Sequence, residues 1–361
     1  MDIVKLLSAM PSLHASDLHL QVASPPCFRV NGEIAPADMP PISGPDMREL
    51  LAPVLNEDRL KRLESNRSVD FAYVVPGVAR FRVNIYYERG EWCGAFRIIP
   101  NNIPTVEELR LPAVLTEIAL APRGLVLVTG ATGSGKSTSL AAMINVINTG
   151  YRKRIITVED PIEFMHPSKK SLISQREIGV DATSFNTSLK EALRQNPDVI
   201  LLGEMRDRET VETALQAADT GHTVFATLHT TTAAQTLQRL TAFFPADERP
   251  RILLDLAASL EAVICQRLAK TADNQGRVPV NEVMRTTPPI RKLLAEGNVL
   301  GIPRIIAGKE NGMRLFDQHL VELLRANIIA GKEAARLANN PEAVLLARKG
   351  IESADLAGGI G

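Results

Sequence analysis

The sequence predicts an α/β protein with two domains, and three observations support this. The chain has 361 residues, more than one ordinary hydrophobic core holds. Over residues 1–100, short segments of alternating apolar and polar residues predict antiparallel strands mixed with helices. Beyond residue 122, uninterrupted apolar runs alternate with helical segments, which is typical of buried strands in a helix-covered sheet. We therefore expect an α+β domain over 1–100, a linker over 101–122 and an α/β domain over 123–361.

The N-terminal domain is expected to hold an antiparallel sheet. SDLHLQ and PCFRVNGEI are predicted strands, and residues 46–64 have helical spacing. In ARFRVNIYYERG apolar and polar residues alternate, which places Arg82 on the polar face of a strand. A turn at 88–90 leads into EWCGAFRIIP, a second strand that carries Arg97. Prolines then recur through 101–122 and mark that segment as the linker.

Composition argues against several classes of protein. The 41 basic and 41 acidic residues leave a formal net charge of +0, which disfavours a dedicated nucleic-acid binder, and aromatic residues for base stacking are scarce at 4%. Three separated cysteines offer neither a cysteine zinc site nor a disulfide framework, so a cytoplasmic protein is expected. Without a signal-peptide pattern or an apolar run of membrane-spanning length, direct membrane insertion is not expected.

GATGSGKS satisfies the pattern of a phosphate-binding loop. An apolar run precedes it as a strand and STSLAAMINVIN follows it as a helix. Glycines allow backbone amides to surround phosphates, while a lysine reaches the β- and γ-phosphates and a hydroxyl holds magnesium. The segment predicts a nucleoside triphosphate site formed by Gly130, Thr132, Gly133, Ser134, Gly135, Lys136, Ser137 and Thr138.

Further chemistry is expected at the ends of the later strands. DVILLGE ends in Glu204, which is placed to bind magnesium together with Ser137. RIITVEDPIEF ends in an acidic cluster, in which Glu163 is the candidate general base because it lies beyond the turn with more freedom to reach a water. The odd spacing of His222 and His229 disfavours a shared metal site. His229 follows a strand and is a candidate sensor of the γ-phosphate.

TTPPIRKLLAEG predicts a short helix far downstream of these motifs. Threonines offer an N-cap, two prolines fit the first turn and a glycine ends the helix. Ile290, Leu293 and Leu294 share one face, while Arg291 and Lys292 project elsewhere. The simple interpretation is a surface helix whose apolar face docks on the core.

Four blocks in order carry a family resemblance: GATGSGKST, ITVEDPIEF, RQNPDVILLGEMRDRET and GHTVFATLHTT. Together with SDLHL and PPCFRVNG near the start and GMRLFDQHL near the end, they make the chain resemble the secretion-type hexameric ATPases, and among them the PilT-like motors that retract type IV pili. The resemblance implies a PAS-like N-terminal domain followed by a RecA-like P-loop ATPase domain. It also implies ATP and Mg²⁺ as cofactors.

The same resemblance implies partners and residue roles. The expected assembly is a homohexamer that acts on an inner-membrane pilus platform protein, beside a second retraction ATPase, at the cytoplasmic face of the inner membrane. The family's catalytic groups match Glu163, Glu204, His229, Arg82 and Arg97, and a histidine of the nucleotide site matches His222. From the residues alone, Arg82 and Arg97 are also consistent with surface arginines that form salt bridges and have no role in catalysis.

PIRKLL resembles the family's retraction motif, written AIRNLI. It keeps Ile290, Arg291 and Leu293, which implies contact with a partner, whereas Pro289 and Lys292 depart from the motif.

Several alternatives stay open at this point. They are a PilU-like accessory retraction ATPase, a pilus assembly or type II secretion ATPase, a module that uses ATP only as a switch, and a nucleic-acid translocase. The assembly and secretion ATPases usually carry a tetracysteine zinc motif, which three cysteines cannot build.

Overall fold

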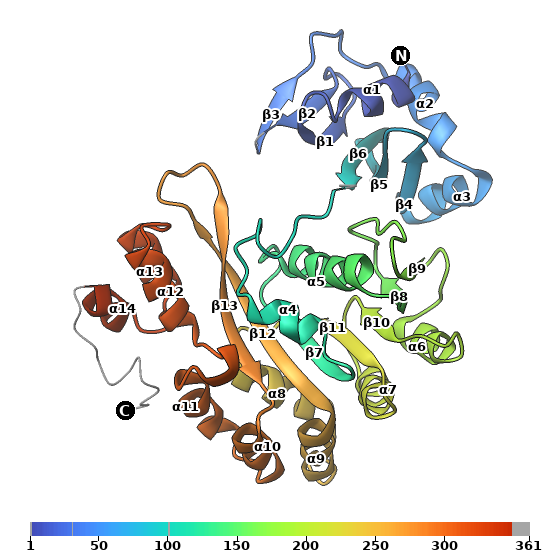
Figure 1. The fold of residues 1–361 in the computed structure, drawn as a ribbon. Helices are drawn as coiled ribbons and strands as arrows, with labels where there is room; N and C mark the ends of the chain where they lie inside the picture. Colours follow the sequence, from blue (N-terminus) through green and yellow to red (C-terminus); the bar gives the residue numbers. More distant parts are fainter. Residues whose placement is uncertain (1, 31, 100–101, 349–361) are drawn as a thin grey trace. The chain divides into compact units, whose positions relative to one another are not determined.

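The computed structural model describes residues 2–30, 32–99 and 102–348, and the chain divides into two compact units (Figure 1). Unit 1 comprises Met1–Asn102 together with Glu163–Met165, and unit 2 comprises Ile103–Ile162 and His166–Gly361. One cluster of buried apolar side chains, drawn from residues 3–96, forms the core of unit 1. Two further clusters form the core of unit 2. Within the described residues, no helix has the length and apolar character needed to cross a bilayer.

Unit 1 is built on a six-stranded antiparallel sheet in the order β3-β2-β1-β6-β5-β4. Its strands are β1 Ala15–Leu20, β2 Cys27–Val30, β3 Glu33–Pro36, β4 Ser68–Val75, β5 Ala79–Glu88 and β6 Glu91–Ile99, and its helices are α1 Ile3–Ala9, α2 Gly44–Leu51 and α3 Glu57–Asn66. The helical segment expected at 46–64 is divided because a 3₁₀ turn at Ala52–Val54 contains Pro53. The predicted hairpin turn lies between β5 and β6, where Arg89 and Gly90 have φ of 52° and 85°.

Unit 2 is built on a seven-stranded sheet in the order β13-β12-β7-β11-β10-β8-β9 (Figure 1). All neighbouring strands are parallel except β12 and β13. The strands are β7 Gly124–Thr129, β8 Arg154–Glu159, β9 Leu172–Glu177, β10 Val199–Leu202, β11 Thr223–Leu228, β12 Leu260–Lys270 and β13 Arg277–Arg285. The four apolar runs in the sequence are β7, β8, β10 and β11, and this sheet is the predicted α/β class.

Consecutive side chains of a strand point to opposite sides of the sheet, so a wholly apolar strand such as β7 presents apolar side chains on both faces. Helices cover both of these faces. On β7, Leu125 and Leu127 join one apolar cluster, whereas Val126 and Val128 join the other with residues of α4 and α5. The helices are α4 Val114–Ala119, α5 Lys136–Gly150, α6 Phe185–Leu193, α7 Arg208–Asp219, α8 Ala233–Ala242, α9 Arg249–Ser259, α10 Pro288–Ala295, α11 Ile302–Ala307, α12 Phe316–Arg325, α13 Gly331–Leu337 and α14 Pro341–Arg348.

The segment expected to be a linker, 101–122, is partly structured. It contains α4, and Leu115 and Ile118 of that helix are fully buried in the cluster formed with α5. Val106 and Leu111 are buried in the same cluster. The prolines do interrupt regular structure, but the apolar residues between them pack on unit 2.

Candidate nucleotide-binding and catalytic site

The parallel strands of unit 2 bring three of the predicted motifs to one edge of the sheet. The phosphate-binding loop follows β7, Glu204 lies just beyond β10, and His229 follows β11, which lies between β7 and β10. The carboxyl ends of parallel strands meet at one edge, where ligands of open α/β sheets bind. His222 instead precedes β11, and its carbonyl accepts a hydrogen bond from the Gly124 amide at the start of β7. It therefore lies at the opposite edge of the sheet.

Backbone conformation explains the glycines of the phosphate-binding loop. Gly130, Gly133 and Gly135 have φ of 147°, 77° and 85°, a region that favours glycine. A Cβ atom at Gly130 would lie 2.3 Å from the carbonyl oxygen of Gln266 on β12, so a side chain has no room there. The loop delivers the chain directly into α5 at Lys136.

The remaining loop residues place donors around the N-terminus of α5. Lys136 is 8% exposed, and its Nζ donates to the carbonyl oxygens of Gly130 at 2.8 Å and Ala131 at 3.1 Å. Ser134 is also buried, and its Oγ has no hydrogen-bond partner among the described residues. Ser137 and Thr138 are half-buried in the first turn of the helix, and Thr132 and Gly133 are exposed. A helix N-terminus with buried donors favours anions such as phosphate.

Glu204 is held between two basic side chains at the end of β10. Its Oε2 accepts from Arg206 Nε at 2.8 Å and lies 2.7 Å from Nη2 of the same arginine. Its Oε1 lies 3.2 Å from His229 Nε2. Burial alone would raise the pKa of Glu204, but the bonds to Arg206 and the neighbouring His229 outweigh it and lower that pKa. A cavity of about 610 Å³ borders this carboxylate. Glu204 is thus an ionised carboxylate, a group of the kind that divalent cations prefer.

Two side chains of β9 accept hydrogen bonds from the acidic segment that follows β8. Gln175 Oε1 accepts from the His166 amide at 2.7 Å, and Glu177 Oε2 accepts from the Ile162 amide at 3.2 Å. These bonds hold the two ends of the short segment that carries Glu163. Glu163 itself is exposed. Neither β9 residue was identified from the sequence, since nothing in the local pattern marks Gln175 or Glu177 as a support.

Arg82 and Arg97 face each other on neighbouring strands of unit 1. They are directly opposite in the pairing of β5 with β6, a position at which like charges repel. Arg97 Nε lies 2.7 Å from Oδ1 of Asp17 on β1, and Asp17 is 6% exposed. Burial raises the pKa of Asp17, but hydrogen bonds from Ser16 and Arg97 lower it by more than burial raises it. The net pKa is below the ordinary value, so the carboxylate stays ionised. Arg82 is exposed and makes no ion pair within the described part of the chain.

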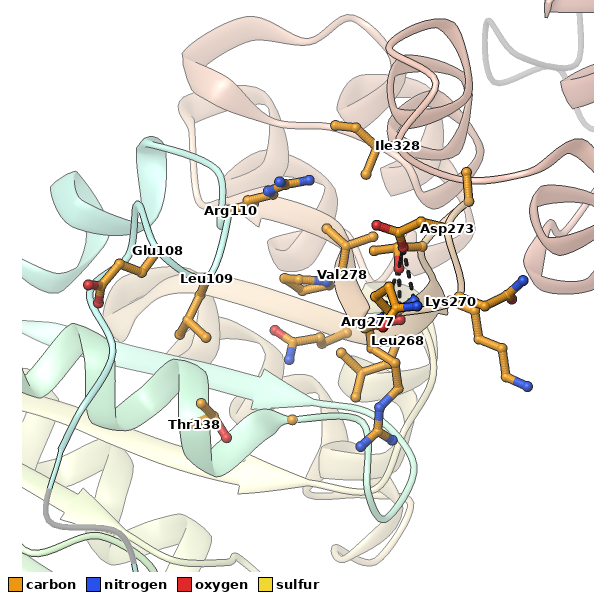
Figure 2. A pocket seen from close by; sticks show the side chains of 18 of the residues that line it. Glu108, Leu109, Arg110, Thr138, Leu268, Lys270, Asp273, Arg277, Val278 and Ile328 are labelled. Atoms are coloured by element: carbon orange, nitrogen blue, oxygen red, sulfur yellow. Dashed lines mark hydrogen bonds between the residues drawn. The ribbon is translucent and has the colours of Figure 1, made fainter. Parts of the chain in front are cut away.

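A cavity of about 1160 Å³ opens beside the phosphate-binding loop (Figure 2). Its walls come from the first turn of α5, the hairpin of β12 and β13, and the segment before α4. Thr138 lies on the loop side, and Arg110, Lys270, Asp273 and Arg277 lie around the opposite walls (Figure 2). Lys270, Asp273 and Arg277 were not predicted from the sequence, because the hairpin that carries them has no recognisable motif.

The downstream helix, α10, is placed by its apolar residues. Ile290 and Leu294 are fully buried and Leu293 is half-buried, all packed on the core of unit 2. Arg291 is exposed, and its Nε donates to the carbonyl oxygen of Ala257 on α9 at 2.8 Å. Ile290 therefore anchors the helix, and the exposed surface is left to Arg291, Lys292 and the edge of Leu293.

Comparison with known proteins decides the family. The model of the type II/IV secretion system proteins matches residues 105–327. The chain belongs to this family. It is 46% identical to a twitching motility protein of Neisseria gonorrhoeae, with 88% of this chain and 86% of the relative covered. It is 44% identical to the type IV pilus retraction ATPase PilT of Pseudomonas aeruginosa, with 95% and 99% covered.

Two further comparisons place the chain within the secretion ATPase family. It is 41% identical to the type IV pilus ATPase PilU of Pseudomonas aeruginosa, with 98% of this chain and 93% of the relative covered. The crystal structure of the pilus retraction motor PilT with bound ADP superposes with a TM-score of 0.88 at 40% identity, covering 95% of this chain and 98% of that one. The predicted resemblance, the two-domain fold class and the ATPase class are confirmed.

Proposed function

We propose that this chain hydrolyses ATP to retract type IV pili, acting as a homohexamer on an inner-membrane platform protein at the cytoplasmic face. The observation that carries the proposal is the meeting of the phosphate-binding loop, Glu204 and His229 at one sheet edge. That site lies in a chain similar over nearly its whole length to a PilT retraction ATPase. The proposal includes an N-terminal domain that ends at residue 100 and an ATPase domain that begins after residue 122. Motion between these domains passes force to the platform protein.

The residues at the site fit ATP with Mg²⁺. Ser137 offers a hydroxyl at the start of α5, and Glu204 offers an ionised carboxylate, which are the hard oxygen donors that magnesium prefers. When bound, the ion would neutralise charge on the β- and γ-phosphates. The loop amides, with Lys136, bind the phosphates, and the 1160 Å³ cavity beside the loop receives the nucleoside.

Protein side chains then carry the rest of the reaction. Glu163 accepts a proton from the attacking water, and His229 senses the γ-phosphate through its contact with Glu204. Arg82 and Arg97 neutralise charge that develops on the γ-phosphate, as a fixed guanidinium does in other phosphoryl transfers. His222 lies at the opposite sheet edge of its own unit and takes no part in this scheme.

A PilU-like accessory role is the second candidate, because the chain is 41% identical to a PilU protein over 98% of its length. An accessory motor and a principal motor share the same chemistry, so they differ in whether retraction proceeds without a second ATPase. Retraction by this protein in a strain that lacks every other retraction ATPase would favour the principal role.

Phosphate release from the purified protein tests the enzymatic part. Wild-type protein should hydrolyse ATP, and Lys136→Ala should reduce the rate by at least about 100-fold, since it removes a buried positive charge beside the phosphates. Lys190→Ala, an exposed lysine of α6, is the matched control and should hydrolyse normally. Wild-type protein that binds ATP without releasing phosphate would instead support a switch module.

A further inference from the structure

Gln266 joins three elements around the phosphate-binding loop. It lies in β12, next to β7, and is 2% exposed. Its Nε2 donates to the carbonyl oxygen of Ser134 in the loop at 2.8 Å. Its Oε1 accepts from Ser139 Oγ in α5 at 2.8 Å and from Asn281 Nδ2 in β13 at 3.0 Å. One carboxamide therefore connects the loop, the second turn of α5 and the edge strand.

The bond to Ser134 fixes the direction of a loop peptide. In a trans peptide the carbonyl oxygen and the amide hydrogen point in opposite directions. Because Gln266 holds the Ser134 oxygen toward β12, the amide of Gly135 points away from β12. Outward-facing amides of this kind are what a phosphate-binding loop offers an anion.

β12 also limits how the loop can fold. A Cβ atom at Gly130 would lie 2.3 Å from the Gln266 carbonyl oxygen, and one at Gly135 would lie 2.9 Å from Gln266 Nε2. Two of the loop glycines thus lie directly against Gln266. At Gly130 the backbone contact leaves no room for a side chain, whereas a Cβ atom at Gly135 would displace the Gln266 carboxamide from its position.

We propose that Gln266 is a positioning residue for the phosphates of the nucleotide: it sets the shape of the loop through Ser134 and does not itself bind the phosphates. The proposal rests on the nucleotide-binding function proposed above. Gln266 also lines the large cavity beside the loop, so a direct contact with the nucleoside is the competing explanation. The two explanations differ in what they predict for a ligand that has phosphates and no nucleoside.

The test compares Gln266→Met with wild-type protein in binding to ATP and to inorganic tripolyphosphate. Methionine keeps the length of the side chain and removes its hydrogen bonds. We expect both ligands to bind about tenfold more weakly, the effect of about one lost hydrogen bond in the positioned loop. Gln318→Met is the matched control, since Gln318 is a buried carboxamide whose Nε2 donates to the Ala307 carbonyl and whose Oε1 accepts from the Leu315 amide, in α12. Its two affinities should stay within twofold of wild type.

Each outcome decides between the explanations. Loss of ATP affinity with unchanged tripolyphosphate affinity would show a nucleoside contact and overturn the positioning role. Unchanged affinity for both ligands, with stability lowered as in Gln318→Met, would leave Gln266 a purely structural residue. Wild-type protein that bound neither ligand would overturn the proposed function as well.

A second variant covers the case in which Gln266→Met does not fold. Gln266→Glu keeps the acceptor for Ser139 and Asn281 and replaces only the donor that holds Ser134. The introduced carboxyl is buried, so in its protonated form it can still donate to the Ser134 carbonyl oxygen, and only its ionised form repels that oxygen. The same tenfold loss for both ligands, relative to wild-type protein at the same pH, is therefore expected to develop as the pH is raised from 6 to 9. Affinities equal to those of the wild type would contradict the proposal.

Discussion

Glu163 and Glu204 are both carboxylates near strand ends, but their surroundings differ. Glu204 is bound by Arg206 and His229, and its pKa lies below the ordinary value, which makes it a poor proton acceptor. Glu163 is exposed and lies in a segment held at both ends by β9. Glu204 as a metal ligand and Glu163 as the base therefore stay predictions, and the two environments allow each role to be tested separately.

Glu163→Gln should therefore separate binding from chemistry. The amide keeps the size of the side chain but cannot accept the proton of the attacking water, so ATP should bind normally and turnover should fall by about 100-fold or more. Single-turnover hydrolysis together with ATP affinity measures both quantities. Glu310→Gln, at an exposed glutamate of unit 2, serves as the control. Normal turnover in Glu163→Gln would show that another group is the base.

His319 links helix α12 to β13, and its pKa lies well below the ordinary value. Its Nδ1 accepts a hydrogen bond from the Asn281 amide at 2.9 Å, and burial, helped by Arg314, lowers its pKa from 6.5 to about 4. Between those values the unfolded chain binds a proton that the folded chain excludes. The stabilising contribution is therefore complete above pH 6.5 and is lost as the pH falls toward 4.

His319→Asn tests this, because asparagine can accept the same hydrogen bond without titrating. Wild-type protein should lose about 2 kcal/mol more unfolding free energy than the variant between pH 6.5 and pH 5. Urea unfolding at the two pH values measures the difference. Equal losses in the two proteins would mean that His319 does not exclude a proton in the folded state.

At the scale of elements, apolar runs in the sequence predicted the strands that are buried on both faces. The strands that carry buried polar residues, β12 and β13, were not predicted. β7, β10 and β11 are wholly buried and have few polar residues. β12 and β13 carry Gln266, Asn281 and Glu282, which are also buried but make specific hydrogen bonds. A hydrophobicity pattern reads such residues as surface, because the partners that satisfy them lie far away in the sequence.

The helix α10 was well predicted, with one difference at its start. It begins at Pro288 after Thr287 and ends before Gly297, whose φ is 71°. The Thr287 side chain makes no capping hydrogen bond, so the prolines and the burial of Ile290 and Leu294 determine the start of the helix.

Arg291→Ala should reduce pilus retraction while the ATPase rate stays within twofold of wild type. Arg291 is exposed and belongs to no group that touches the nucleotide site, although its bond to Ala257 orders it on the surface. Retraction frequency and phosphate release, measured on the same variants, separate force transmission from hydrolysis. Lys292→Ala, which loses only a distant ion pair to Glu296 at 3.9 Å, is the neighbouring control. Unchanged retraction in Arg291→Ala would reduce α10 to a surface helix.

At the scale of the whole molecule, local motifs identified the chemistry, while contacts distant in sequence determine its geometry. Arg97 and Asp17 are 80 positions apart, and Gln266 and Ser134 are 132 apart, yet each pair shares a hydrogen bond. Spacing within a motif carries no information on such pairs. The family resemblance supplied roles for Arg82 and Arg97, but only the strand pairing shows that they lie side by side.

The most direct test of the account is to record individual pili on host cells that lack this gene. We predict abundant pili that extend and do not retract, with retraction restored by a wild-type copy and not by Lys136→Ala, which removes the buried lysine of the phosphate-binding loop. Cells without pili would show that the protein assembles them. Pili that extend and retract normally would contradict the proposed function altogether.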